Sequence, residues 1–260
     1  VYTVEYYYEE KGAYPETATS SVKRSGTTDA EAAVTAEDKE PNGAGYVFDE
    51  NAENILSGTI AGNGSLVLRV YFKEQFTVTY KPGTQGTFKE QKTENLDYNA
   101  DTPEFVGTPD GNAGYTFAGW TPRVAETVNG NAEYTAQWTA NEDTKYTVEY
   151  YYQNADGSYP STTGLKREGS GTTDTRADVT DGDKTPAEAG YVFDATNGSN
   201  VLSGTIAGNG SLVLKVYFKL QFTVTYKPGT QGTFEEQKTE NLDYNADTPE
   251  FVGTPDGNAG

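Results

Sequence analysis

The sequence has no cysteine, no histidine and no methionine among its 260 residues. Disulfide bridges, the usual His/Cys zinc sites and Ser–His or Cys–His catalysis are therefore excluded. Basic residues are also few, 19 against 39 acidic ones, which gives a net charge of −20. Such a chain does not favour the phosphates of nucleic acid or the surface of anionic lipid. We therefore expect no nucleic-acid partner. The sequence also has no 18-residue apolar run, so we expect no membrane insertion.

Aromatic residues and glycine are plentiful instead, with 20 Tyr, 11 Phe and 29 Gly. This composition favours a sheet-rich protein with many turns, and it is too aromatic for a disordered chain. The sequence begins without an initiator methionine or a signal peptide, so we expect it to be a piece excised from a longer protein.

An internal repeat organises the chain. Residues 2–8 return as 146–152, residues 45–49 as 190–194, and residues 56–68 as 202–214. Residues 76–114 return as 222–260 with one change, Lys89 against Glu235. The second copy is one residue longer around 9–13 and again around 50–55, which marks two surface loops, because paired strands do not tolerate such insertions.

The repeat predicts four units, which we name repeat A (1–74), repeat B (75–140), repeat A′ (145–220) and repeat B′ (221–260). Repeat B′ ends where repeat B continues with 115–120 and 134–138, two apparent strands. We therefore expect repeat B′ to be loosely held, or completed by strands from a neighbour.

Local patterns predict the elements of each unit. Alternation with a period of two indicates strands at 2–8 and 76–80. Further strands are expected at 87–96, 115–120 and 133–138. Residues 55–60 and 66–72 flank a Gly-Asn-Gly turn, which is typical of a hairpin. The sequence Thr28-Asp-Ala-Glu31 has the form of a capping box and predicts a short helix to about Asp38.

Repeat B carries Gly114-Tyr-Thr-Phe-Ala-Gly-Trp120 followed by Tyr134-Thr-Ala-Gln-Trp138. In these motifs it resembles the Listeria–Bacteroides repeat, the B-repeat of internalin-type surface proteins. Repeats A and A′ are similar, more loosely, to the mucin-binding-protein (MucBP) repeats of Gram-positive adhesins. There the resemblance lies in the opening Tyr-Thr-Val-Glu-Tyr strand, in Gly45-Tyr46 and in the closing Gly-Thr-Ile…Val-Tyr-Phe segment. Repeat A lacks the usual Asp-Gly turn after its first strand, whereas repeat A′ has one at Asp156-Gly157.

The resemblance implies an α+β, predominantly β fold: tandem small β-grasp-like (ubiquitin-like) domains, each with one helix or helical turn on a mixed sheet, strung into an elongated beads-on-a-string rod. It also implies that the first and last strands of a domain pair in parallel, so that pulling on the chain loads them in shear. Neither family is catalytic.

Carboxylate pairs and oxygen-rich loops raise two alternatives. Paired acids run glycosidase chemistry, but 39 acidic residues make chance pairs common and these units are too small for a deep cleft, so we expect no enzyme. Calcium is the metal that oxygen ligands suit, and the densest clusters are Asp181-Gly-Asp183 and Asp97-Tyr-Asn-Ala-Asp101. Neither has the full calcium-loop pattern, and turn-forming residues account for both, so the favoured expectation is no cofactor and no metal.

Aromatic side chains on the outward phase of strands could stack on sugar rings. Cross-strand packing on the sheet face is the alternative and is favoured. The candidates for contact with a glycan are Tyr7, Tyr71, Tyr151 and Tyr217.

These observations lead to one functional interpretation. The chain is expected to be a stalk fragment of a secreted, wall-anchored Gram-positive surface adhesin, monomeric within a longer repeat array, that projects a distal binding domain at the bacterial cell surface. The alternative is that the A repeats themselves bind host mucin or another host glycan.

Overall fold

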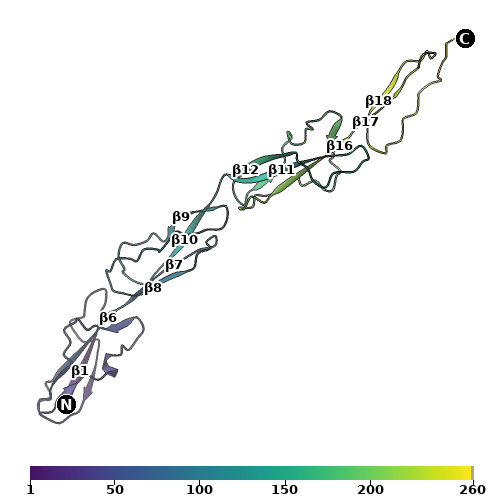
Figure 1. The fold of residues 1–260 in the computed structure, drawn as a ribbon. Helices are drawn as coiled ribbons and strands as arrows, with labels where there is room; N and C mark the ends of the chain where they lie inside the picture. Colours follow the sequence, from purple (N-terminus) through teal and green to yellow (C-terminus); the bar gives the residue numbers. More distant parts are fainter. Residues whose placement is uncertain (259–260) are drawn as a thin grey trace. The chain divides into compact units, whose positions relative to one another are not determined.

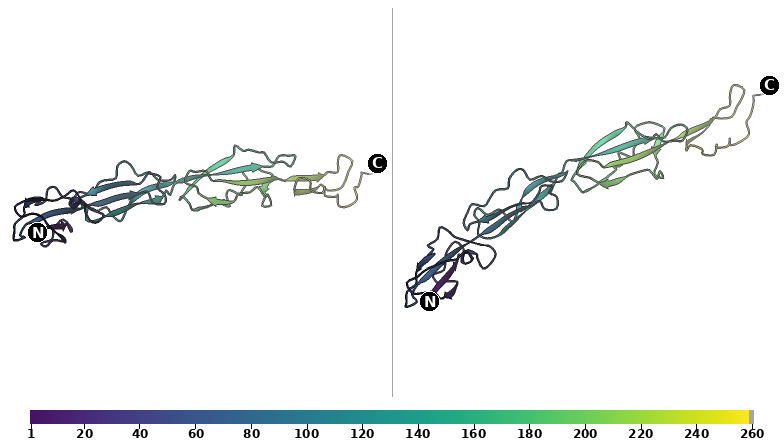
Figure 2. Two further views of the ribbon diagram at one scale, coloured as in Figure 1. Left: turned by 90° about the horizontal axis from the view of Figure 1, so that it is seen from below. Right: turned by 60° about the horizontal axis from the view of Figure 1, so that its bottom comes forward.

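The computed structural model describes residues 1–258 and consists almost entirely of strands and loops (Figure 1). Over these residues it has one short 3-10 helix, Glu37–Lys39, and no α-helix. Strands and loops are also what the two further views in Figure 2 show. No helix in this range has the length and apolar character needed to cross a membrane. The chain divides into two compact units, residues 1–111 with 117–138 and residues 112–116 with 139 onward.

The first sheet, sheet A, has the strand order β2-β1-β6-β4. Its strands are β1 (Tyr2–Tyr8), β2 (Ser20–Arg24), β4 (Tyr46–Phe48) and β6 (Val67–Glu74). The first and last of these strands lie side by side and run parallel, in register from Thr3↔Val67 to Tyr8↔Phe72. Strands β2 and β4 add to the two edges in antiparallel fashion. A separate two-stranded ribbon joins β3 (Glu31–Ala33) to β5 (Ser57–Thr59).

Sheet B has the order β8-β7-β10-β9, and these four strands lie next to one another in Figure 1. They are β7 (Phe76–Lys81), β8 (Gln91–Leu96), β9 (Tyr115–Thr121) and β10 (Ala132–Ala140). Here too the first and last strands are parallel neighbours, with Ala132 beside Val78 and Thr135 beside Lys81.

Sheet A′ repeats the plan of sheet A with the order β12-β11-β16-β14. Its strands are β11 (Thr144–Tyr152), β12 (Lys166–Gly171), β14 (Tyr191–Phe193) and β16 (Val213–Leu220). Strands β13 (Arg176–Asp178) and β15 (Ser203–Thr205) form the accompanying ribbon. The parallel pair β11–β16 has the same six-residue register, from Thr147↔Val213 to Tyr152↔Phe218.

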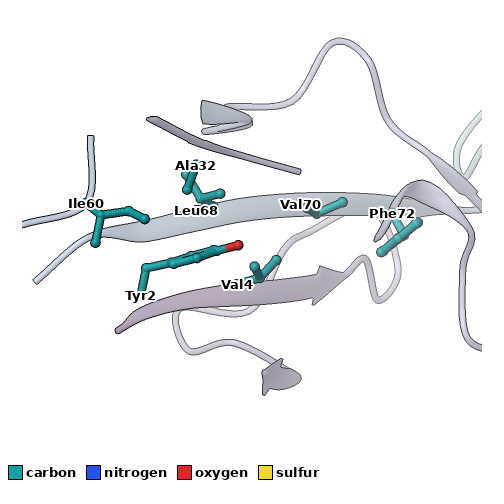
Figure 3. Close-up of a cluster of buried hydrophobic side chains, with 7 residues drawn as sticks. All are labelled: Tyr2, Val4, Ala32, Ile60, Leu68, Val70 and Phe72. Carbon is teal, nitrogen blue, oxygen red and sulfur yellow. The ribbon is translucent and has the colours of Figure 1, made fainter. Parts of the chain in front are cut away.

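One face of sheet A forms a small core (Figure 3). Alternation places every second side chain of β1 and β6 on this face, where the ribbon β3–β5 and the nearby turn cover it. Full burial of a side chain such as Phe72 stabilises the fold by about 1.5–3 kcal/mol. The members of this core are Tyr2, Val4, Ala32, Ile60, Leu68, Val70 and Phe72.

The helix expected from Thr28 to about Asp38 is wrong. Asp29 has φ +67, a left-handed conformation that an α-helix does not contain. The next residues form β3, in which Ala32 is buried in the core and pairs with Gly58. Long-range pairing with β5 thus overrides the local capping signal, and only the 3-10 turn remains.

The hairpin expected from 55–60 and 66–72 is also largely wrong. Ile55 makes a single antiparallel bridge to Arg69, and the segment then leaves to pair with β3 as β5. Strand β6 instead takes β1 and β4 as its partners.

The last described segment has the sequence of repeat B but a different environment. Strand β17 (Phe222–Tyr226) pairs with β18 (Gln237–Leu242) and, over the described residues, with no other strand. Phe76, Val78 and Tyr80 of β7 are buried, whereas their counterparts in β17 are only partly buried.

Candidate functional site

The face of sheet A opposite the core carries a cluster of aromatic side chains. Because β1 and β6 are in parallel register, Tyr7 lies directly beside Tyr71. Their rings stack with centroids 4.6 Å apart and planes inclined by 15°. In sheet A′, Tyr151 and Tyr217 stack in the same way, at 4.6 Å and 9°. The two candidate tyrosines of each repeat are therefore brought together.

A third tyrosine completes each cluster and was missed in the sequence. Tyr14 meets Tyr71 edge-on at 4.9 Å, and Tyr159 meets Tyr217 at 5.1 Å. The Tyr14 hydroxyl donates to Asp49 at 2.7 Å. Tyr14 and Tyr159 follow the loop whose length differs between the copies, so their equivalence becomes visible only when the one-residue insertion is placed before them.

Carboxylates accept hydrogen bonds from the hydroxyl groups of four of these tyrosines, Tyr7, Tyr14, Tyr151 and Tyr159. Tyr7 donates to Glu5 at 2.8 Å and Tyr151 to Glu149 at 2.7 Å. The bond to Glu149, with burial, raises the pKa of Tyr151 to about 12. Burial, with the bond to Asp194, raises the pKa of Tyr159 to about 12 as well. The phenols of Tyr151 and Tyr159 therefore keep their proton to a higher pH than an ordinary tyrosine does.

The cluster borders a cleft of about 390 Å³ in repeat A. Apart from the tyrosines, its lining includes side chains that donate hydrogen bonds and side chains that accept them: Arg69, Glu16, Glu53 and Asn51. Arg69 also faces Glu5, with Nε and Oε2 3.7 Å apart. Aromatic rings beside such polar groups are the ordinary composition of a carbohydrate site.

The expected exposure of the four candidates requires a correction. Tyr7 is only 6% exposed and Tyr151 only 4%. Both lie on the outward phase of their strands, but each is stacked against its neighbour on the last strand of the sheet, Tyr71 or Tyr217. Tyr71 and Tyr217 are half-buried and remain the accessible members of the stacked pairs.

A second cluster centres on a buried aspartate. Asp38, at the 3-10 turn, accepts hydrogen bonds from the guanidinium of Arg24, the hydroxyl of Tyr6, and both the amide and hydroxyl of Thr35. The Arg24 Nη1 to Asp38 Oδ2 distance is 2.7 Å, and Asp38 is 3% exposed. Burial alone would raise the pKa of Asp38, but these donors outweigh it and hold that pKa well below its usual range.

Repeat A′ contains the same network around Asp183. Arg167 approaches it with two nitrogens, at 2.8 and 2.7 Å, and Tyr150 donates at 2.6 Å. Thr180 supplies the amide and hydroxyl donors. The network was missed because its members come from β11, β12 and a loop. The available signal was an arginine on the second strand paired with an aspartate 14 or 16 residues later in both repeats.

The two clusters considered for calcium have other partners in the structure. Asp183 is surrounded by the hydrogen-bond donors just described, while the side chain of Asp181 is fully exposed. Asp97 pairs with Lys73, with Nζ and Oδ1 2.9 Å apart. Within residues 1–258, no group of three or more acidic side chains is gathered that could hold a metal ion.

Several solved structures match this chain, and they include the following two. The type 2 repeat of the mucus binding protein MUB from Lactobacillus reuteri is 14% identical, over 56% of this chain and 98% of that one, with a TM-score of 0.17. Mub-RV is 13% identical, over 55% of this chain and 97% of that one, also with a TM-score of 0.17. A TM-score of 0.17 is too low to assign the fold or the function of this chain. No described protein family matches the sequence, and no curated protein does. The resemblance to the Listeria–Bacteroides repeat therefore stays a prediction.

Proposed function

We propose that this chain is a non-catalytic repeat region of a secreted, cell-wall-attached bacterial surface adhesin, in which it acts as a spacer that projects a distal binding domain. The repeats 1–74, 75–140 and 145–220 are its folded units, each a β-grasp-like sheet in which short strands and turns replace the helix. The family resemblances in the sequence motifs support the cell-surface assignment. The strand topology supports the spacer role.

The observation that carries the proposal is the parallel pairing of the first and last strands in all three four-stranded sheets: β1 with β6, β7 with β10, and β11 with β16. When two parallel neighbours are the entry and exit strands, the chain enters a sheet at one end and leaves at the other. Tension along the chain then pulls the two strands in opposite directions along their length. All the hydrogen bonds between them resist together rather than one after another.

Single-molecule pulling tests the spacer role. Stretching residues 1–260 from the two ends is expected to give three main unfolding events, one for each four-stranded sheet. Each event should release roughly 200–250 Å of chain, because an extended residue spans at most about 3.6 Å. All three should occur at forces typical of shear.

The absence of native cysteine allows a matched control. Handles attached through Val1→Cys and Ser25→Cys pull repeat A across the antiparallel pair β1–β2, in which Tyr2 lies opposite Arg24. That geometry opens hydrogen bonds one at a time, so repeat A should unfold at a lower force than in end-to-end pulling. Equal forces in the two geometries would contradict the load-bearing role.

The tyrosine cleft favours a second candidate function, in which the A repeats themselves bind mucin or another host glycan. Tyr71 and Tyr217 supply partly exposed rings beside polar side chains, and the cluster has the same geometry in both repeats. A sugar stacked on such a ring is held by contacts worth about 1 kcal/mol per ring.

Binding of residues 1–260 to immobilised mucin and to a glycan array tests this candidate. If the cleft binds, the double variant Tyr71→Ala/Tyr217→Ala, which removes one ring from each repeat, should weaken binding at each site about fivefold, the factor that corresponds to about 1 kcal/mol. Tyr98→Phe removes a tyrosine hydroxyl outside the cleft and serves as the control. Absence of binding at high micromolar concentration would reject the candidate and leave the spacer proposal untouched.

A further inference from the structure

The connection between sheet A and sheet B is one residue long. Strand β6 ends at Glu74 and β7 begins at Phe76. The linking residue, Gln75, is itself fixed in place, because its backbone amide donates a hydrogen bond to the backbone carbonyl of Gly45 at 2.7 Å. Both sheet A and the β7–β8 pair belong to the first compact unit. The second unit has the same link at Gln221, whose amide donates to Gly190 at 2.7 Å.

Polar side chains join the two sides of this link. Asp97 follows β8 and accepts a hydrogen bond from Lys73 Nζ at 3.0 Å. The side-chain amide of Gln75 donates to the other oxygen of the same carboxylate. In the second unit, Asp243 accepts from Lys219 at 2.6 Å and from Gln221.

An aromatic ring and a glycine form the other half of the contact. The ring of Tyr98 lies against Gly12, in the loop after β1, so closely that a Cβ on Gly12 would be 2.6 Å from its Cδ1 atom. Tyr244 lies against Gly157 in the same way, with a corresponding distance of 2.3 Å. Both glycines have positive φ, +79 and +81, which other residues adopt only with strain.

The difference in loop length between the two copies makes this contact informative. The loop that carries the glycine is one residue longer in the second copy, with Gly157 in place of Gly12. The glycine nevertheless meets the tyrosine ring in both. An incidental contact would be expected to shift with the insertion, whereas a contact that matters for the joint would be retained.

We infer that Gly12, Lys73 and Gln75 form a socket for the Asp97–Tyr98 turn of the following repeat, and that this socket joins an A-type repeat to a B-type repeat as one rigid pair. Gly157, Lys219 and Gln221 form the same socket for Asp243–Tyr244. The partner that fits is defined chemically: a repeat that presents a carboxylate and then an aromatic ring directly after its second strand. The use of the joint to stiffen a spacer rests on the proposed function, but its existence does not.

Distance measurement between spin labels tests the joint in the full chain. Because the chain lacks cysteine, Val22→Cys in repeat A and Val106→Cys in repeat B can be labelled specifically, and both positions are exposed. The pair Val22→Cys/Glu50→Cys, within repeat A, gives the width expected of a rigid body. We expect the 22–106 distribution to be as narrow as the 22–50 distribution.

Variants on the two sides of the socket should each abolish that narrow distribution. Asp97→Ala alters only repeat B, and Lys73→Ala/Gln75→Ala alters only repeat A and the link. The charge-swapped variant Lys73→Asp/Asp97→Lys should restore part of the narrow width of the 22–106 distance distribution. Circular dichroism melting identifies any variant in which a sheet has unfolded.

Two glycine variants separate the effect of the Gly12–Tyr98 contact from the effect of general backbone strain. Gly12→Ala places a Cβ on the Tyr98 ring and should broaden the 22–106 distribution. Gly64 has a similar φ, +74, but its nearest neighbour would be 3.6 Å away, so Gly64→Ala should leave the distribution narrow. The inference is overturned if Asp97→Ala and Gly12→Ala leave the width unchanged, or if the unaltered chain is already as broad as these variants. Pulling experiments on the spacer are independent of either result.

Discussion

Replacing Asp183 with alanine is expected to lower the free energy of unfolding of repeat A′ by about 3 kcal/mol. The substitution removes the acceptor of a buried ion pair and leaves its hydrogen-bond donors without a partner. The guanidinium of Arg167, Tyr150 and Thr180 all donate to this carboxylate, which is 4% exposed. We expect the low end of the range for such pairs because the arginine side chain is 39% exposed and can return to water. In a unit of this size the melting temperature should fall by roughly 12–24 °C.

Thermal and urea unfolding measure this effect, and the chain offers two internal controls. Asp181→Ala, two residues away, removes a fully exposed carboxylate and should change stability by no more than about 0.5 kcal/mol. Repeat A retains its own network at Asp38, so its transition should stay in place. Equal destabilisation by both substitutions would show that the network contributes nothing special.

The same network predicts how stability depends on pH. The pKa of Asp183 is depressed in the folded state, since the donors to its carboxylate outweigh the effect of burial. A depressed carboxyl pKa gives stabilisation that is fully present above the unfolded value of about 3.9 and is lost as the pH falls towards the folded value. Urea unfolding between about pH 6 and 2 should therefore show a loss of stability below about pH 4. Asp183→Ala should flatten that loss for repeat A′; an unchanged slope would contradict the assignment.

Hydrogen exchange is expected to be about 100-fold faster in β17 than in β7, although the two strands have the same sequence. Strand β7 has β8 on one side and β10 on the other, whereas β17 pairs with β18. Val78 is 1% exposed, and its counterpart Val224 is only partly buried. A difference of about 2.7 kcal/mol in opening free energy corresponds to this factor, and the core of a small sheet supplies about that much.

Mass spectrometry can read the two copies separately. Peptides that begin before the strand differ in mass, because Glu74 precedes one copy and Leu220 the other. The variant Lys89→Glu removes the single sequence difference between 76–114 and 222–260, so any remaining difference in exchange arises from strand pairing. Equal exchange rates in a dilute monomer would contradict the prediction, and slow exchange in β17 at high concentration would indicate strands borrowed from a second copy.

The strands were the most predictable part of the fold. Alternation located β1 and β7 to within a few residues, because the side-chain period of a strand is a local property of the chain. The strands expected at 115–120 and 133–138 are present as β9 and β10. The parallel pairing of first and last strands, which the family resemblance implied, is present in three sheets. The candidate tyrosines could also be placed on the outward phase of their strands from the sequence alone.

The tertiary structure decided what the local pattern could not. Tyr7 is buried because Tyr71, 64 positions later in the chain, stacks on it, and Tyr14 is held in the cluster by Asp49. The expected helix gave way to β3 because pairing with β5 buries Ala32, a gain that a capping box cannot offer. The sequence by itself thus determined the repeat, the strands and their faces, which depend on neighbouring residues. The sockets, the aromatic clusters and the Arg–Asp networks depend on contacts between distant segments, and only the folded chain brings those segments together.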